Sequence, residues 1–349
     1  MEFESNHEHI RNAFMSILTK GVKNNTYKFA LARFLLDYSR ELGSPPLESK
    51  KLKVKYTKVA KEFFRYYWMQ ECKSHLRQGP INQPPEIITI IRDEFKEAFY
   101  PQSVDKIIKK ELVRVENCIF RITKKCFDDV IPRFEIDAEA YFGRQRSKPP
   151  YSRILYNYWA REQKSKNFVI DTNGGIELNP HAISMLQHNY EPLYRSVILE
   201  WIRFLERRNF GVPHLVQKIE AREMGPRDQA RFKKYLEPFT NSCFYCSGKL
   251  LQGRCTHVDH VIPYDYVGDT ELWNLVLACQ KCNCEKSGHL PPEQHIMRLQ
   301  ERNEEYRGQI KKLEKSLTEL EYGGYDVCWH YNNAASFGYA KLDSIPRQG

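Results

Sequence analysis

Two pairs of cysteines constrain this chain more than any other feature of its sequence. Each pair has the spacing C-x-x-C, and 32 residues separate the pairs, which are Cys243 with Cys246 and Cys279 with Cys282. Four thiolates spaced in this way form a closed tetrahedral zinc site with metal–sulfur distances of about 2.3 Å. Because a closed site offers no open position, the predicted Zn²⁺ is structural and fastens a module too small to build much core.

The cellular setting decides between a metal site and disulfides. Residues 1–9 are polar and partly acidic, without the basic start and apolar stretch of a secretory signal. The chain also has no uncharged apolar run of about 18 residues, so we expect no membrane helix. Paired C-x-x-C motifs in a reducing compartment indicate metal binding. We therefore expect a soluble, cytoplasmic protein whose paired cysteines bind zinc.

The spacing of apolar residues predicts a mainly α-helical chain that carries a small α+β module. Three parts are expected: a mainly helical domain at 1–240 that binds DNA or a partner, a cysteine module at 241–290, and a C-terminal helix and tail at 291–349. Within the first part, the alternation of Ile119, Arg121 and Thr123 indicates a strand. Apolar stretches on both sides of Asn173-Gly174-Gly175, within 167–178, predict a β-hairpin.

The C-terminal part begins with one long predicted helix at 293–321. Its apolar stripe, interrupted by Asn303, consists of Leu299, Tyr306, Ile310, Leu313, Leu317 and Leu320. The stripe spans only about three heptads, which is marginal for an independent coiled coil. We therefore expect this helix to pack on the chain's own helical domain, and a monomer rather than a homodimer.

Positive charge lies outside the cysteine module. The formal net charge is +10, whereas 241–290 carries four basic and five acidic side chains. Residues 50–77 hold nine Lys or Arg and two Glu, interleaved with aromatic residues. If residues 50–77 were helical throughout, four of these cations would share one face. The basic loop at 144–150 adds two more cations. The predicted DNA-binding residues are Lys51, Lys55, Lys58, Arg65, Arg144 and Arg146. The alternative is a solvated helix with its aromatic side against the core.

Between the cysteine pairs, Asp259 and His260 stand together in an apolar run that ends at Pro263. A carboxylate suits Mg²⁺, and an imidazole suits a general base near neutral pH. Strand alternation sends the two side chains to opposite faces unless a bend or bulge brings them together. Taken alone, such a pair is more often a buried, salt-bridged histidine.

Two asparagines and a lysine extend this set. Asn274 precedes the second cysteine pair, and Asn283 follows Cys282 directly. A neutral oxygen of Asn283 would share a Mg²⁺ ion with Asp259, leaving positions for phosphate oxygens and water. Lys286, one helical turn after Asn283, would help to offset developing phosphate charge.

The order of these motifs closely resembles that of the HNH endonucleases, with their ββα-metal fold: C-x-x-C, D-H-x-x-P, a Gly-containing loop, Asn-Leu, then C-x-x-C followed by Asn or His and Lys. The resemblance implies that His260 is the general base that activates water, and that Asp259 and Asn283 bind the catalytic metal. It also implies that Asn274 braces the active-site loop against the strand of His260. The final Asn, a variant also used by the RNA-guided CRISPR nucleases, favours Mg²⁺ or Mn²⁺ over a catalytic zinc.

The resemblance covers about 50 of the 349 residues. Helices near Asn25 and at 201–209 also look like those of bacterial HNH proteins from restriction and anti-phage loci, which suggests antiviral defence with other defence proteins as partners. His257 and His289 are runner-up ligands. The unpaired Cys255 and Cys284, which depart from the family pattern, are interpreted as small buried fillers.

Three functions fit the sequence. The leading hypothesis is a metal-dependent DNA endonuclease, in which water attacks a phosphodiester with help from a base, a Lewis acid and a grip on the backbone. The second is a zinc-stapled nucleic-acid-binding or partner-binding module without catalysis, which explains the cysteines and the charge but leaves the Asp-His-Asn-Asn-Lys set to coincidence. The third is action on RNA, because nothing in the sequence discriminates recognition of the 2′-hydroxyl.

Overall fold

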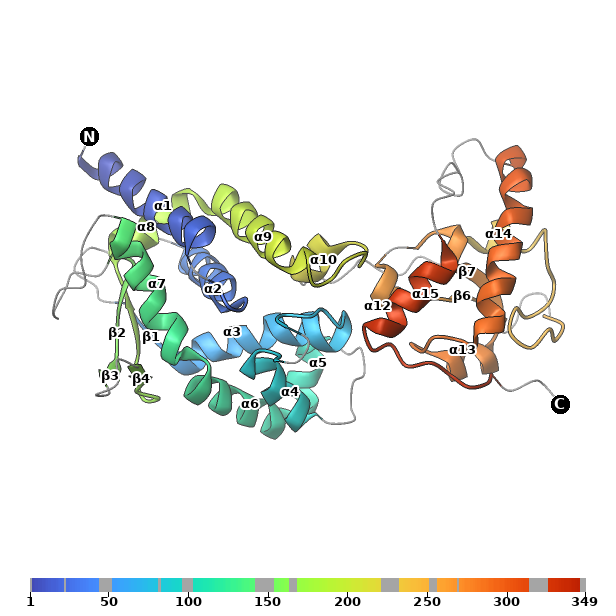
Figure 1. Ribbon diagram of the computed structural model, residues 1–349, viewed down its shortest axis with the longest axis horizontal. Helices are drawn as coiled ribbons and strands as arrows, with labels where there is room; N and C mark the ends of the chain where they lie inside the picture. Colours follow the sequence, from blue (N-terminus) through green and yellow to red (C-terminus); the bar gives the residue numbers. More distant parts are fainter. Residues whose placement is uncertain are drawn as a thin grey trace. The chain divides into compact units, whose positions relative to one another are not determined.

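The computed structural model describes residues 2–21, 23–43, 52–80, 83–95, 103–141, 154–162, 168–220, 232–250, 256–268, 270–313 and 326–345. The chain divides into two compact units. Unit 1 comprises Met1–Lys73, Arg77–Asn209 and Ile219–Ala221, and unit 2 comprises Ser74–Leu76, Phe210–Lys218 and Arg222–Gly349. Helices dominate both units (Figure 1). None of the helices in the described part combines the length and apolarity needed to cross a bilayer.

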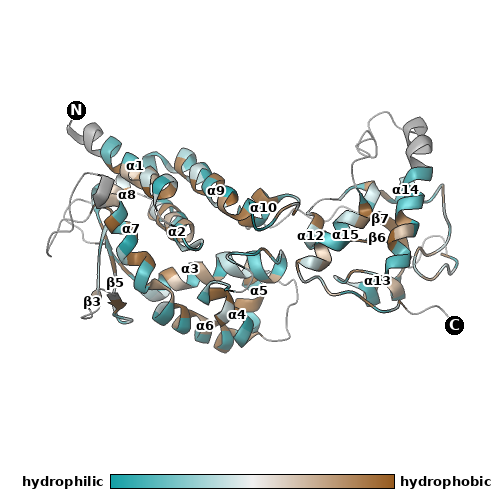
Figure 2. Cartoon of the chain, viewed as in Figure 1, coloured by the Kyte–Doolittle hydropathy of each residue, from teal (hydrophilic) through white to brown (hydrophobic). Residues whose placement is uncertain are grey.

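Unit 1 is a bundle of helices whose hydrophobic and hydrophilic residues segregate to different faces (Figure 2). α2 lies in its core, packed against α3, α8 and α9. The helix expected near Asn25 is confirmed as α2: it begins after Thr26 and ends before Gly43, whose φ of +70° suits a glycine. The helices are α1 (Glu2–Lys20), α2 (Tyr27–Glu41), α3 (Tyr56–Trp68), α4 (Glu86–Glu94), α5 (Val104–Lys110), α6 (Leu112–Lys125), α7 (Phe127–Tyr141), α8 (Pro180–His188) and α9 (Tyr190–Glu206), with a π-helix at Met69–Lys73.

Two small antiparallel sheets belong to unit 1. One has the order β1 (Leu52–Lys55), β5 (Gly175–Leu178), β2 (Tyr156–Tyr158), and the other pairs β3 (Ala160–Glu162) with β4 (Phe168–Ile170). The two stretches predicted as a hairpin are strands, but they do not pair with each other: β4 pairs with β3, and β5 pairs with β1 and β2. A Cβ on Gly175 would meet the Val54 carbonyl oxygen at 2.1 Å, so this glycine permits close strand approach instead of forming a hairpin turn.

One other expectation for unit 1 is wrong, and the condition attached to the predicted DNA-binding face is not met. The strand predicted around Ile119 is helix α6, because Val115, Cys118 and Ile122 are buried at helical spacing and override the local alternation. Residues 50–77 are not helical throughout, because β1 pairs with β5 before α3 begins at Tyr56. The aromatic residues of α3 are buried, as the alternative to a DNA-binding face expects; they are Tyr56, Phe63, Phe64, Tyr66, Tyr67 and Trp68.

Unit 2 holds the cysteine module and the C-terminal segment. Strands β6 (Thr256–His260) and β7 (Leu275–Cys279) pair antiparallel, and α13 (Gln280–Lys286) packs against both, which gives a ββα arrangement. The remaining elements are α10 (Leu215–Glu220, whose last two residues belong to unit 1), α11 (Lys233–Leu236), α12 (Tyr264–Val267), a 3₁₀ turn at Leu272–Asn274, α14 (Glu293–Leu313) and α15 (Val327–Ser336). The expected continuation of α14 to residue 321, and its stripe beyond residue 305, lie outside the described side chains.

Candidate functional site

The sulfur atoms of the four paired cysteines lie within 4.8 Å of one another. A tetrahedral zinc ion with bonds of about 2.3 Å requires sulfur–sulfur separations of about 3.8 Å, and Cys246 Sγ lies 4.0 Å from Cys279 Sγ. Burial raises the pKa of the Cys243 thiol, so a thiolate there needs a cation beside it. These four soft donors therefore fit a structural zinc ion.

Each cysteine pair occupies a turn that local hydrogen bonds close. In the first turn, the Cys243 N–H donates to the Gly248 carbonyl at 2.8 Å, and the Ser247 N–H donates to the Cys243 carbonyl at 2.9 Å. Cys279 ends β7 at the start of α13, which brings Cys282 back toward the first pair. The Cys279 N–H donates to Cys243 Sγ at 3.3 Å, so an N–H···S hydrogen bond links the two turns.

Asp259 is held from two sides. The Tyr245 hydroxyl donates to Asp259 Oδ2 at 2.6 Å, and Lys286 Nζ lies 3.3 Å from the same oxygen. Burial and the nearby Asp259 carboxylate raise the pKa of Tyr245 well above its ordinary value, so this hydroxyl is a donor. Within the described part of the chain, the other oxygen, Oδ1, has no hydrogen-bond partner. Asp259 therefore has one fixed oxygen and one oxygen available to a ligand.

His260 is the next residue on β6 and is 3% exposed. The strand stays regular here, with Asp259 opposite Val276 and His260 opposite Leu275, so the two side chains leave opposite faces of β6. The His260 ring packs against the Tyr264 ring at 5.1 Å between centroids, whereas Asp259 contacts Tyr245 and Lys286. The Asp259 and His260 side chains therefore follow the regular alternation of a strand, and no bulge interrupts β6 at this pair.

Asn274 is completely buried and binds the backbone just after β6. Its amide oxygen accepts from the Ile262 N–H and its amide nitrogen donates to the Ile262 carbonyl, both at 2.8 Å. Its own carbonyl accepts from the Val261 N–H at 2.9 Å. Three hydrogen bonds thus fix the bend that follows His260, the contact expected of a bracing residue.

Asn283 lies on α13, half-buried and one turn before Lys286. Among the described residues, its amide has no hydrogen-bond partner. Carboxylate and amide oxygens are the hard ligands that Mg²⁺ and Mn²⁺ prefer. The free oxygen of Asp259 and the amide oxygen of Asn283 therefore fit such an ion in chemical type.

The other candidates near the module are placed as follows. His257 is half-buried on β6, and His289 is exposed, with its Nδ1 at 3.1 Å from the Lys286 carbonyl oxygen. Cys284 is exposed on α13, so its interpretation as a buried filler is wrong, because its position on the helix faces solvent. Cys255 lies outside the described residues, as do Lys51, Arg144 and Arg146 of the DNA-binding prediction.

Two residues of α14 that the sequence did not assign to the site bind the segment that carries Asn274. The Arg302 guanidinium donates to the carbonyl oxygens of Leu272, Trp273 and Leu275. Asn303, expected to interrupt an apolar stripe, is buried and donates to the Trp273 carbonyl at 2.8 Å. A polar residue in an apolar stripe was the available signal for this contact.

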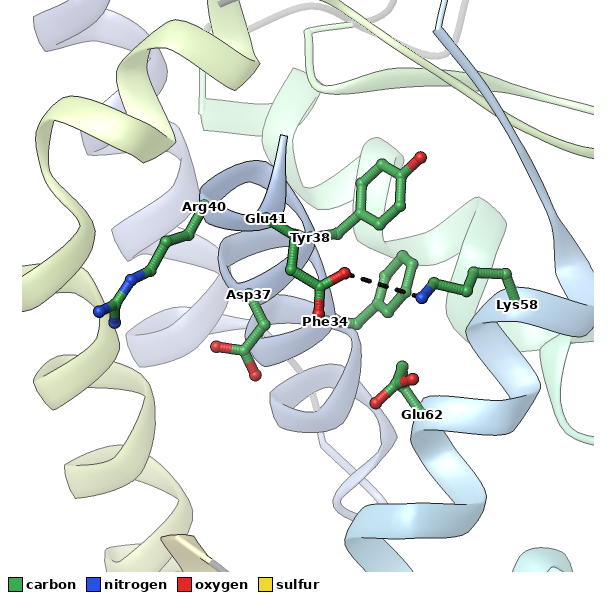
Figure 3. Close-up of a pocket in the computed structure, with 7 residues that line it drawn as sticks. All are labelled: Phe34, Asp37, Tyr38, Arg40, Glu41, Lys58 and Glu62. Atoms are coloured by element: carbon green, nitrogen blue, oxygen red, sulfur yellow. Dashed lines mark ion pairs between the residues drawn. The ribbon is translucent and has the colours of Figure 1, made fainter. Parts of the chain in front are cut away.

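A pocket of about 400 Å³ in unit 1 is a separate feature, lined by Phe34, Asp37, Tyr38, Arg40, Glu41, Lys58 and Glu62 (Figure 3). Lys58 points toward Glu41, with 3.7 Å between its Nζ and Glu41 Oε2. Asp37 accepts hydrogen bonds from the hydroxyls of Tyr66 and Tyr190 at 3.0 and 2.8 Å. Burial raises the pKa of Glu62. The charged groups that line the pocket pair with each other and with neighbouring hydroxyls. We therefore assign no chemistry to this pocket.

Comparison with curated proteins and with solved structures gives no match to the chain. Comparison with protein families gives a match that covers the candidate site. The matched range begins at Cys243 and contains the four clustered cysteines together with Asp259, His260, Asn274, Asn283 and Lys286. Residues 243–288 of the chain match the family described as HNH endonuclease, which indicates nuclease activity in general for this segment.

Proposed function

We propose that this chain is a metal-dependent endonuclease that hydrolyses phosphodiester bonds in DNA. The observation that carries the proposal is the pair of unpartnered hard oxygen donors, on Asp259 and Asn283, within the segment that matches the HNH family. Asn274 supports it by fixing the bend after His260. A place in restriction or anti-phage defence, with defence proteins as partners, stays a prediction from the sequence alone.

The reaction would be an attack of water on phosphorus. His260 ends β6, so the bend that Asn274 holds, and not the strand itself, would have to bring its ring to the phosphate bound beside Asp259. An imidazole nitrogen of His260 would accept a proton from the attacking water, a bond would form between the water oxygen and phosphorus, and the bond to the leaving sugar oxygen would break; that oxygen would take a proton from solvent. A Mg²⁺ or Mn²⁺ ion, held by Asp259 and Asn283, supplies Lewis-acid stabilisation of the phosphate when bound. The Lys286 ammonium, predicted to offset developing phosphate charge, lies 3.3 Å from Asp259 Oδ2, and we propose that it acts through that carboxylate.

A second candidate function is a zinc-stapled nucleic-acid-binding module without catalysis. The ion pair between Lys286 and Asp259 favours it, because this pair satisfies a buried carboxylate without a metal ion. The two candidates differ in one measurable property, which is cleavage of DNA in the presence of Mg²⁺ or Mn²⁺.

The test is a plasmid cleavage assay on the full-length protein. We expect nicking of supercoiled DNA with Mg²⁺ or Mn²⁺ and none with EDTA. Asp259→Asn, which keeps the shape of the side chain but removes its charge, should lower the cleavage rate at least about 100-fold and leave the zinc content unchanged. Asp326→Asn is the matched control, because asparagine also caps a helix, as Asp326 does for α15. Wild-type protein that binds DNA and zinc but never cleaves DNA would establish the second candidate, a nucleic-acid-binding module without catalysis.

We also propose that a groove in unit 1 grips the DNA backbone. This lysine groove, of about 680 Å³, is lined by Lys53, Lys55, Lys58 and Lys61 together with the apolar side chains of Ile108, Leu112, Val115 and Ile119. Val54 is buried between the exposed Lys53 and Lys55, so β1 presents both lysines on one face. Glu116 is the acidic residue of the lining.

The ion pairs around the lysine groove explain why it is preferred over the originally predicted face. Arg65 lies 2.9 Å from Asp105 and 3.7 Å from Glu62, so its charge is already balanced. Lys55 and Lys61, by contrast, have no ion-pair partner among the residues that the structure describes. Unbalanced cations attract phosphates because binding releases counterions from the nucleic acid.

Removing two of these charges should change the salt dependence of binding. For the double variant Lys55→Gln with Lys61→Gln, we expect the slope of log K against log salt to become shallower by about 2. Fluorescence anisotropy of a labelled DNA duplex in EDTA measures this without cleavage. The control removes two exposed lysines of unit 1 outside the groove, Lys109 and Lys124. Equal slopes for the two double variants would contradict the assignment.

A further inference from the structure

Tyr245 connects the first cysteine pair to the candidate metal site. It stands between Cys243 and Cys246, is 5% exposed, and places its hydroxyl 2.6 Å from Asp259 Oδ2. Lys286, itself 1% exposed, approaches the same oxygen. Both donors of this carboxylate therefore act on Oδ2, and Oδ1 is left for another ligand.

The ring of Tyr245 is held firmly, so its hydroxyl has a defined position. The ring packs edge-on against Phe244 at 5.3 Å and against His295 of α14 at 5.4 Å between centroids. Arg298, also on α14, donates to the Phe244 carbonyl at 2.7 Å and so ties the turn of the first cysteine pair to that helix. A hydroxyl carried by this turn is fixed by the cysteine site and by α14 together.

We propose that Tyr245 is a positioning residue for the catalytic metal: its hydroxyl fixes the Asp259 carboxylate so that Oδ1 faces the ion. This inference rests on the proposed function, because it assumes that Asp259 binds the metal. The terminal torsion of an aspartate is broad, so a carboxylate held by Lys286 alone can rotate. A freely rotating carboxylate would offer both oxygens to the ammonium, which competes with the metal ion. Groups that orient a metal ligand in this way typically contribute 10- to 100-fold in metal affinity.

The experiment measures Mn²⁺ binding directly, by electron paramagnetic resonance on the zinc-loaded full-length protein without DNA. Tyr245→Phe removes the hydroxyl and keeps the ring, and we expect the dissociation constant for Mn²⁺ to rise about tenfold or more with zinc content unchanged. Tyr331→Phe is the matched control, because Tyr331 is 2% exposed in the same unit and its hydroxyl donates to the Pro291 carbonyl at 2.9 Å. The control should bind Mn²⁺ as the wild type does.

Asp259→Asn separates failure of this inference from failure of the proposed function. Mn²⁺ binding that survives Asp259→Asn unchanged would remove the catalytic metal site and the proposed function with it. Binding that Asp259→Asn weakens, but that Tyr245→Phe leaves equal to the Tyr331→Phe control, would overturn only the role of Tyr245. Loss of zinc from Tyr245→Phe would also overturn it, because the hydroxyl would then support the cysteine turn and not the carboxylate.

Discussion

Replacing Cys243 with serine is expected to release zinc and to unfold the segment 243–288. Cys243 is fully buried, and its sulfur both belongs to the cluster and accepts a hydrogen bond from the Cys279 N–H. A structural zinc site supplies folding free energy on the order of 10 kcal/mol, more than so small a core can replace. Elemental analysis and hydrogen exchange of the full-length protein, resolved by peptide, measure the two effects separately.

Cys284→Ser provides the control for this experiment. Cys284 lies on α13 in the same segment but is exposed, so its serine variant should keep one zinc ion per chain and the exchange protection of β6 and β7. Cys279→Ser should behave as Cys243→Ser does. A Cys243→Ser protein that has lost its zinc and yet shows wild-type protection across β6 and β7 would contradict a structural role for the metal.

Replacing His260 with alanine should abolish DNA cleavage while zinc stays bound. A positioned general base contributes about 10²- to 10⁴-fold, so the rate of supercoiled-plasmid nicking should fall by at least about 100-fold. Because His260 is buried, the cavity itself will cost some stability, and His260→Asn, which fills more of the space, should lose the same activity. A time course of plasmid nicking with both variants measures the effect.

His330→Ala controls for the loss of a buried imidazole. His330 lies on α15 in the same unit and is 8% exposed. Its alanine variant should keep cleavage within a few-fold of wild type. Nicking by both His260 variants at the rate of His330→Ala would take His260 out of the mechanism and direct attention to His257, which is half-buried on the same strand.

The helices of unit 1 could be read from the sequence where burial and periodicity agree, and strand pairing could not. α2 and α3 bury long apolar stripes, and their positions follow from the 3.6-residue period. Around Ile119, three residues alternate as in a strand, although the wider spacing of Val115, Cys118 and Ile122 is helical. Gly175 resembled a hairpin turn because the approach of Val54, 121 positions earlier in the chain, leaves no local trace.

Within the site, residues recognisable by type were predicted and residues defined by a distant partner were not. The cysteine spacing identified the cluster, and the Asn274 contact with Ile262 lies where the family pattern places a bracing residue. Tyr245 was an unspecified position in C-x-x-C, because its importance depends on how the first turn sits against β6. Lys286 could be identified as a cation, but only the packing of α13 reveals that it faces Asp259.

Side chains of α14 donate hydrogen bonds to backbone carbonyls of the matched segment. These contacts determine how short a fragment of this chain can be when it is fused to another protein. Arg302 and Asn303 stand beyond the matched segment 243–288, yet they supply donors to the carbonyl oxygens of Leu272, Trp273 and Leu275. A fragment cut at residue 290 keeps all four paired cysteines but removes the α14 donors of the Trp273 and Leu275 carbonyls, at about 1–3 kcal/mol for each one left unsatisfied. A fusion that moves the matched segment with its backbone contacts intact must therefore include α14, so the folding unit is longer than the stretch that matches the family.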